Sequence, residues 1–182
     1  MLLTPNDARR FMATYERVAM AVHAVAGLDA PRSPQACLAS AREALEETPG
    51  LLDEAVAVLK KEGVQADEDV VKALRLMQLG EWIHLKDLKS GAIFLNGEGT
   101  EAYCAVGLTQ QPSAILGGKG FLVETGLCPF AGRILCDGVF VARAQLGRNI
   151  WSECHQRYLS LKATGHLHRS PATAPLWAAA PV

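Results

Sequence analysis

The chain has 182 residues, of which 49% are hydrophobic and 20% are charged, and its formal net charge is −1. This length suits one domain, and the composition is typical of a globular protein, which excludes a chain that is disordered throughout. A nearly neutral chain also lacks the strong basic excess that supplies most of the affinity of dedicated nucleic-acid-binding proteins.

The N-terminal residues and the cysteines predict the compartment. The stretch MLLTPNDARRFMATY has no basic region followed by an apolar run, so we expect no secretory signal peptide. No apolar run approaches the roughly 20 residues that a membrane-spanning helix needs. The 5 cysteines are an odd number at irregular spacing, unlike a secreted disulfide framework. We therefore expect a cytoplasmic protein with reduced thiols and no membrane association.

Four helices are predicted in residues 1–80, because apolar residues recur there at helical spacing between start and stop signals. Thr4 can cap the first helix, and Pro5 would stand at its first position, where a missing N–H costs nothing. The other predicted starts are Ser33 with Pro34, Thr48 with Pro49, and Asp67, and the predicted stops are Gly27, Gly63 and Gly80. Each helix carries one apolar stripe, which must be buried against another element.

From about residue 81 the pattern changes to short runs rich in aromatic and β-branched residues, separated by Gly-rich turns. The runs are EWIHLKD, GAIFLN, EAYCAVGL, GFLVETGLC, GRILC and GVFVARA, and SAIL could form one helical turn between two of them. Short strands at such intervals indicate an antiparallel meander or a small half-open barrel of about six strands. Between two of the runs, Asp137 and Gly138 predict a type I′ hairpin turn.

The C-terminal part is predicted to be one long helix and a tail. Within residues 147–165, an apolar face is formed by Ile150, Trp151, Cys154, Tyr158 and Leu161, and Gly165 would end the helix. The tail, residues 166–182, is rich in Pro and Ala, and Trp177 is its natural anchor.

The predicted fold class is therefore α+β: four N-terminal helices packed on an antiparallel meander or half-open barrel, followed by one long helix. No linker is long enough to separate two domains. We expect residues 1–182 to form a single domain with a helical part (1–80), a β part (81–146), a helix (147–165) and a tail (166–182).

The stretch LCPFAGRILCDG carries two thiols, which raises the question of a metal or redox site. With a four-residue corner at residues 129–132, Cys128 would lie opposite Arg133, and Cys136 opposite Thr125. Since side chains alternate along a strand, the two thiols would point to opposite faces of the sheet in this register. They could then share neither a metal ion nor a disulfide, and we interpret both as small core residues. A register shifted by one residue would put both on the same face, still displaced along the strands.

The same register suggests a candidate site for catalysis or for a small ligand. It brings Glu124 opposite Asp137, beside Arg133, and a carboxylate pair with separated pKa values can carry out acid–base chemistry. Such a site predicts a concave pocket with a perturbed carboxylate. The alternative is that Asp137 serves its turn and that Glu124 is exposed or paired with an arginine.

Two further groups near the C-terminus are weak candidates. Cys154 and His155, with His166 and His168, are ligand types that zinc favours, but Cys154 and His155 are adjacent on a helix and point about 100° apart. We interpret Cys154 as core and the histidines as solvated near a helix C-terminus, so that no metal or cofactor is predicted. For weak nucleic-acid binding through the same region the candidates are Arg148, Arg157, Lys162 and Arg169, which outnumber Glu153.

Several segments, in their order along the chain, resemble a family of uncharacterised bacterial proteins. They are LTPNDARRFMATY, LGEWIHLKDLKSGAIFL, EAYCAVGLT, VETGLCPFAGRILCDGVF and RYLSLKATGHL, of which PFAGRILCDG is the most specific. The resemblance implies a shared architecture and no activity, since none is assigned to the family. The residues in common are turn formers, which we interpret as structural: Pro129, Phe130, Gly132, Asp137 and Gly138. Cys136 stands where the family pattern has an aromatic residue, and the first helix lacks a Trp, which points to looser core packing.

No set of polar residues converges on a recognisable catalytic signature in the sequence. We therefore expect a non-enzymatic partner-binding or regulatory module, with a protein partner or a second copy of the chain bound through Trp177 in the tail. The alternatives are an enzyme or small-ligand binder that uses Glu124, Arg133 and Asp137, and a weak nucleic-acid binder that uses the C-terminal helix.

Overall fold

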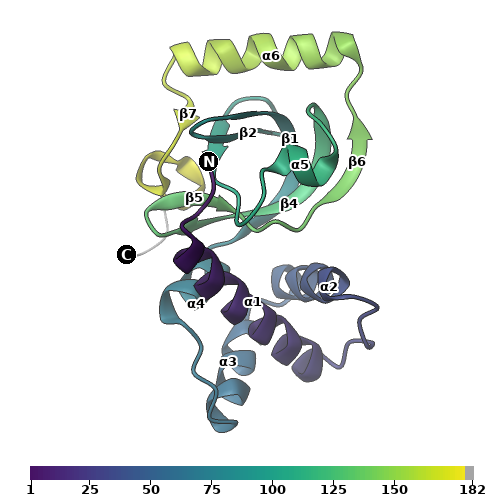
Figure 1. Ribbon diagram of the computed structural model, residues 1–182, viewed down its shortest axis with the longest axis vertical. Coiled ribbons are helices and arrows are strands. Elements are labelled where there is room, and N and C mark those ends of the chain that lie inside the picture. Colours follow the sequence, from purple (N-terminus) through teal and green to yellow (C-terminus); the bar gives the residue numbers. More distant parts are fainter. Residues whose placement is uncertain (179–182) are drawn as a thin grey trace. The chain divides into compact units, whose positions relative to one another are not determined.

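The computed structural model of the chain describes residues 1–178 (Figure 1). These residues form two compact units: a helical unit, Thr4–Leu79, and a sheet unit, which combines Met1–Leu3 with the chain from Gly80 onward. The α+β class is confirmed, since residues 1–178 contain six α-helices and one mostly antiparallel seven-stranded sheet. The expectation of a single domain stays a prediction. Within the same residues no helix combines the length and apolar character needed to cross a membrane.

The helical unit contains the four predicted helices. They are α1 (Pro5–Ala26), α2 (Pro34–Glu47), α3 (Leu51–Lys61) and α4 (Glu68–Arg75). The caps at Thr4, Ser33 and Asp67 are confirmed, because each side chain accepts a hydrogen bond from a backbone N–H of the first turn. The unit is held together by α1, which packs against α2, α3 and α4 with its buried apolar stripe.

Two of the predicted helix boundaries are wrong. Thr48 ends α2 instead of starting α3, whose N-cap is Gly50. The helix predicted to stop at Gly80 ends at Arg75, and a strand already begins at Gln78. In both places the residues carry a helix start or stop signal, but in the structure they belong to a neighbouring element: Thr48 caps the end of α2, and Gly80 lies in the strand.

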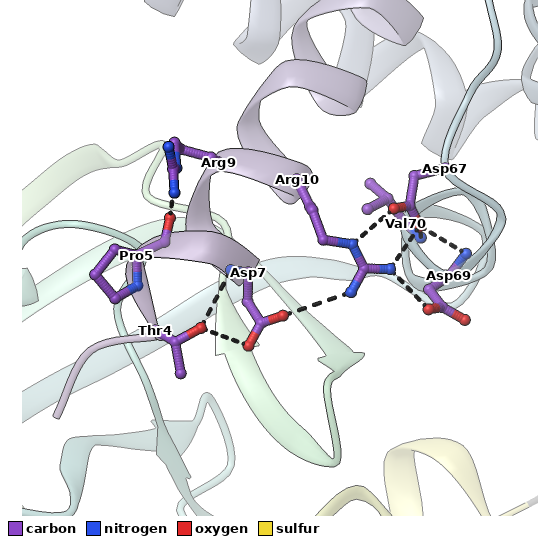
Figure 2. A network of polar contacts seen from close by, with 8 residues as sticks. All are labelled: Thr4, Pro5, Asp7, Arg9, Arg10, Asp67, Asp69 and Val70. Atoms are coloured by element: carbon purple, nitrogen blue, oxygen red, sulfur yellow. Dashed lines mark hydrogen bonds and ion pairs between the residues drawn. The ribbon is translucent and has the colours of Figure 1, made fainter.

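An arginine network links two helices of this unit, as Figure 2 shows. The guanidinium of Arg10 in α1 donates to Asp67 at 2.8 Å and to Asp69 at 2.9 Å, both at the start of α4. It also lies 3.5 Å from Asp7. Asp67 in addition accepts the backbone N–H groups of Asp69 and Val70, so it both caps α4 and ties it to α1. We interpret this network as structural.

The sheet unit contains seven strands: β1 (Gln78–Leu88), β2 (Gly91–Asn96), β3 (Ala102–Ala105), β4 (Phe121–Phe130), β5 (Arg133–Cys136), β6 (Val141–Gln145) and β7 (Leu167–His168). Their order is β5-β4-β1-β2-β3-β7, and β6 pairs with β4. The sheet curls without closing into a complete barrel. The curl brings the residue after β3 next to β5: the N–H of Val106 donates to the carbonyl of Ile134 at 2.8 Å, and its carbonyl accepts from the N–H of Cys136 at 2.9 Å. This open, curled sheet matches the predicted half-open barrel.

Two helices accompany the sheet. The predicted turn SAIL forms α5 (Pro112–Leu116), and the long C-terminal helix forms α6 (Arg148–Ala163), which lies across the strands in Figure 1. Tyr158 and Leu161 of α6 are buried against Leu85, Ile93 and Leu95 of the sheet. The opposite face of the sheet carries the buried aromatic residues Trp82, Phe94 and Tyr103, which alternate along their strands with residues that face α6.

The predicted four-residue corner around Pro129 is wrong, and the partner of Cys128 differs from the predicted one by two positions. Cys128 pairs with Leu135, and Pro129 with Ile134, so the turn has only two residues. Both of these, Ala131 (φ 49°) and Gly132 (φ 70°), have the positive φ of a type I′ turn. Beside such a turn Pro129 occupies a pair without hydrogen bonds, where its missing N–H costs nothing toward β5.

The interpretation of the two thiols survives the corrected register. Cys136 lies opposite Leu127, one position from the Cys128–Leu135 pair, so the two cysteines still point to opposite faces. Both are buried and free, and burial raises the pKa of the Cys128 thiol well above its ordinary value. They are core residues.

The predicted hairpin turn at Asp137 is also wrong. After β5 the chain does not fold back on β5, because β6 pairs with β4, with Glu124 opposite Val141. Asp137 is 2% exposed, and its Oδ1 accepts from Thr125 Oγ1 at 3.0 Å, Gly126 N at 3.3 Å and Val139 N at 3.1 Å. β5 and β6 both pair with β4, and Asp137 lies in the gap between them. There its carboxylate accepts backbone N–H groups that have no partner in the strand ladder.

The tail contains a strand that the sequence does not predict. Leu167 and His168 form β7, which pairs in parallel with Ala102 and Tyr103 of β3. Trp177 is 8% exposed, in a short 3₁₀ turn, and the predicted tail beyond residue 178 lies outside the described residues.

Candidate functional site

A β-bulge in β1 decides which side chains meet on the two faces of the sheet. Residues up to His84 pair with β2 in one register, and from Lys86 onward the register is shifted by one. Lys86 therefore pairs with Ile93, whose side chain faces α6, while Asp87 pairs with Ala92. Without the bulge Lys86 would share the face of His84. With it, Lys86 points toward α6.

On the α6 side Lys86 belongs to a group of basic residues that we call the lysine–histidine cluster: Lys86 of β1, Lys119 of the α5–β4 loop, and His155 and Lys162 of α6. The ammonium of Lys86 lies 2.9 Å from Nε2 of His155. Because an ammonium has only donors, Nε2 must accept, and the imidazole is neutral with its proton on Nδ1. Lys119 and Lys162 are exposed, while Lys86 and His155 are half-buried.

Stacked aromatic rings support the cluster along α6. The ring of His155 stacks on Trp151 with centroids 5.0 Å apart, and on Tyr158 at 6.1 Å. The ammonium of Lys86 lies 4.8 Å from the centre of the Tyr158 ring, and that of Lys119 lies 4.7 Å from the Trp151 ring. Both contacts have cation–π geometry, which holds the two lysines near the imidazole.

Trp151 is itself held in place by the backbone. Its indole N–H donates to the carbonyl of Leu85 at 3.4 Å. Gly120, with φ +74°, lies against the indole so closely that an added Cβ would come within 2.7 Å of Cδ1 of Trp151. The glycine therefore leaves the space that the indole occupies.

The positive charges of the three lysines in the cluster are not balanced by nearby carboxylates of residues 1–178. Burial, and then the charges of Lys162 and Lys119, lower the pKa of Lys86 below its ordinary value. Burial, Lys86 and Lys119 likewise lower the pKa of His155. Within residues 1–178 no carboxylate forms an ion pair with any of the three lysines. Such a group is stabilised by an anion from outside the chain.

A second polar group lies on the other face of β1. Asp87 accepts from Nε2 of the fully buried His84 at 2.9 Å, and from both the N–H and the hydroxyl of Ser113 in α5. The order is serine, aspartate, histidine, so the imidazole does not contact the hydroxyl and cannot activate it as in a catalytic triad. Burial alone would raise the pKa of Asp87, but its hydrogen bonds to His84 and Ser113 lower it. The group ties α5 to β1.

A third group joins β7 to the start of β3. Glu101 accepts from Nδ1 of His166 at 3.0 Å and from Nε2 of His168 at 2.6 Å, one histidine on each carboxylate oxygen. The imidazole of His168 also contacts the ring of Tyr103, whose pKa burial and then Glu101 raise to about 12. Burial would raise the pKa of Glu101, but the two histidines lower it below its ordinary value.

The weak zinc candidates are not brought together as a ligand set. His166 and His168 are joined by Glu101, while Cys154 packs against the apolar core beneath α6. Burial raises the pKa of the Cys154 thiol. A search of residues 1–178 finds no group of three His, Cys, Asp or Glu side chains placed to hold a metal ion.

The predicted Glu124, Arg133 and Asp137 site is not assembled either. Glu124 pairs with Arg143, Asp137 is buried beside Thr125, and the exposed Arg133 lies 3.4 Å from the sulfur of Met1. Glu124 and Thr125 are neighbours on β4, so the two carboxylates lie on different faces of that strand.

The nucleic-acid candidates fall into separate places on the surface. Arg157 lies with Glu153 beside a shallow groove on the outer side of α6, whereas Lys162 belongs to the lysine–histidine cluster. Arg169 donates to the hydroxyl of Ser90 at 3.2 Å, and Arg148 is exposed at the start of α6. Trp177, the predicted partner anchor, is buried.

Sequence reasoning missed most of the lysine–histidine cluster. The spacing of Trp151, His155, Tyr158 and Lys162 on one side of a helix is visible in the sequence. The contributions of Lys86 and Lys119 are not visible, because they depend on the bulge in β1 and on where the α5–β4 loop returns to the sheet.

Comparisons with known proteins add no further information on the site. No family model matches the chain, and neither the curated proteins nor the solved structures contain a match.

Proposed function

We propose that this protein is a binding module that recognises an anionic group of a partner or ligand at the lysine–histidine cluster. One observation carries the proposal: the ammonium of Lys86 contacts a neutral histidine, the charges of Lys119 and Lys162 act on Lys86, and none of the three lysines has a carboxylate partner among residues 1–178. Bringing like charges together costs free energy, which a bound anion offsets.

The character of the site favours binding over catalysis. Its donors are ammonium groups, two of which lie over aromatic rings, and among residues 1–178 no carboxylate forms an ion pair with them. This agrees with the non-enzymatic module that the sequence predicts. The enzyme alternative at Glu124, Arg133 and Asp137 has no comparable support, because each of these side chains has its own separate contact.

The test is a heteronuclear NMR titration of the full chain with phosphate and with citrate at constant ionic strength. We expect saturable shifts at residues 86, 119 and 155 with at least one of the two anions. Lys86→Met keeps the length of the side chain and removes its charge, so it should weaken binding by at least about tenfold, the effect of losing one charged hydrogen bond. The matched control is Lys61→Met, at an exposed lysine in the last turn of α3.

Two results would contradict the proposal. One is the absence of a saturable change with either anion. The other is an equal response in Lys86→Met and in the unchanged protein, which would mean that the anion binds elsewhere.

A further inference from the structure

We infer that the anion recognised by the lysine–histidine cluster is a single phosphoryl group, free or as a small phosphate monoester. The inference rests on the proposed function and names its ligand class. It follows from the type of donor, from the number of uncompensated charges, and from the compactness of the group.

The donors fit a phosphoryl group better than a carboxylate. A carboxylate is planar and pairs best with the planar fork of an arginine, whereas lysine binds phosphate as a point charge. All three cations of the cluster are lysines, and they come from β1, the α5–β4 loop and α6, so they approach from different elements. A tetrahedral group with three free oxygens can accept from several such directions at once.

The charge of the site also fits a phosphoryl group. Lys86, Lys119 and Lys162 are close enough for the charges of the last two to lower the pKa of the first. A phosphate monoester carries about −1.5 to −2 at pH 7, so it offsets more of this charge than one carboxylate does.

The cluster is too compact for a nucleic-acid backbone, which needs a stripe of cations along several phosphates. The neighbouring arginines are engaged or turned away. Arg169 donates a hydrogen bond to the hydroxyl of Ser90, and Arg143 forms an ion pair with Glu124. Arg157 lies with Glu153 on the outer side of α6. What remains is one concentrated positive site beside the half-buried indole of Trp151.

The experiment is isothermal titration calorimetry of the full chain at constant ionic strength and about pH 8.5, where a phosphate monoester is already a dianion. The probes are inorganic phosphate, phenyl phosphate, citrate and a single-stranded oligonucleotide. We expect at least one phosphoryl probe to bind at least about tenfold more tightly than citrate, although citrate carries more charge. A preference for phenyl phosphate over inorganic phosphate would identify a monoester as the ligand, and the reverse would identify the free ion.

A set of variants links binding to the cluster. We expect Lys86→Met and Lys119→Met each to weaken the binding of the phosphoryl probe by at least about tenfold, because each removes one charged donor, while Lys61→Met leaves binding unchanged. Binding by Lys86→Met as tight as that of the unchanged protein would overturn the inference.

The possible failures are distinguishable. Binding of citrate as tight as that of either phosphoryl probe would overturn the phosphoryl inference and leave anion recognition standing. Tighter binding of the oligonucleotide, with a steep dependence on salt, would overturn it in favour of nucleic acid. If no probe binds, both the inference and the proposed function fail.

Discussion

At the scale of single residues, Gly120 shows how one backbone position supports the site. Its φ of +74° lies in the left-handed region, and an added Cβ would come within 2.7 Å of the indole of Trp151. Trp151 in turn stacks on His155 and lies under Lys119. A side chain at position 120 therefore disturbs the cluster without touching any of its charges.

We expect Gly120→Ala to lower the free energy of unfolding by about 2–5 kcal/mol, the sum of left-handed strain and overpacking. Gly117→Ala is the matched control, because Gly117 has the same φ of +74° and nothing within 4 Å of an added Cβ. It should cost only the strain, about 1–2 kcal/mol. Urea unfolding measures both values, and equal losses in the two variants would show that the indole does not press on position 120.

Asp137 illustrates a residue whose role changes with its surroundings. In the sequence it precedes a glycine and predicts a turn. In the fold it is buried and accepts three hydrogen bonds from Thr125, Gly126 and Val139. The carboxylate of Asp137 therefore stabilises the segment between β5 and β6, where the sequence predicts a hairpin turn.

At the scale of elements, the two-residue strand β7 depends on side chains as much as on its ladder. His166 and His168, beside and within β7, both bind Glu101, which precedes β3. Because these hydrogen bonds lower the pKa of Glu101 in the folded protein, its charge stabilises the fold above its ordinary pKa of about 4.3. This contribution is lost as the pH falls through the lower folded value.

We expect Glu101→Gln to reduce the free energy of unfolding by about 1–2 kcal/mol at pH 7. The difference from the unchanged protein should shrink below about pH 4, where the carboxylate of Glu101 protonates in both states. Urea unfolding at pH 7, 5 and 3 measures the dependence, with Glu98→Gln as the control at an exposed glutamate of the β2–β3 turn. A difference that stays constant over this range would mean that the charge of Glu101 contributes nothing.

The bulge in β1 is the element-level feature on which the proposed site depends. It turns Lys86 to the α6 side and Asp87 to the side of His84. One extra residue in the strand thus places the basic Lys86 and the acidic Asp87 on different faces of the sheet.

At the scale of the whole molecule, the chain passes twice between the two units, after Leu3 and after Leu79, and β1 runs through the second passage. We expect the single domain predicted from the sequence to unfold in one cooperative transition. All three tryptophans, Trp82, Trp151 and Trp177, belong to the sheet unit, whereas four of the six α-helices of residues 1–178 belong to the helical unit.

Tryptophan fluorescence and far-UV circular dichroism therefore report mainly on different units during urea unfolding. Coincident midpoints would support a single cooperative domain. Separate midpoints, or a plateau between two transitions, would mean that residues 4–79 and the sheet unit are independent domains. A titration at two protein concentrations is the control, because association would shift the midpoint.

Much of the fold follows from short-range signals. Thr4, Ser33 and Asp67 cap helices as predicted, and the run GAIFLN forms β2 without any change of boundary. The predictions are wrong where the same residues are compatible with two different local structures. Thr48 and Pro49 could start a helix, and Thr48 instead ends one. The candidate site was less predictable, because Lys86, Lys119 and His155 are far apart in the sequence.

The sequence by itself determined most of the elements of this protein, since caps, periodicity and turn residues act over a few positions. It also predicted that Cys128 and Cys136 face opposite sides, which holds because the register differs from the predicted one by two positions, and a shift by an even number preserves the alternation. Only the tertiary structure decided the register around Pro129, the partner of β6 and the strand β7. It alone assembled the lysine–histidine cluster, because contacts between distant residues depend on a bulge and a loop that no local pattern records.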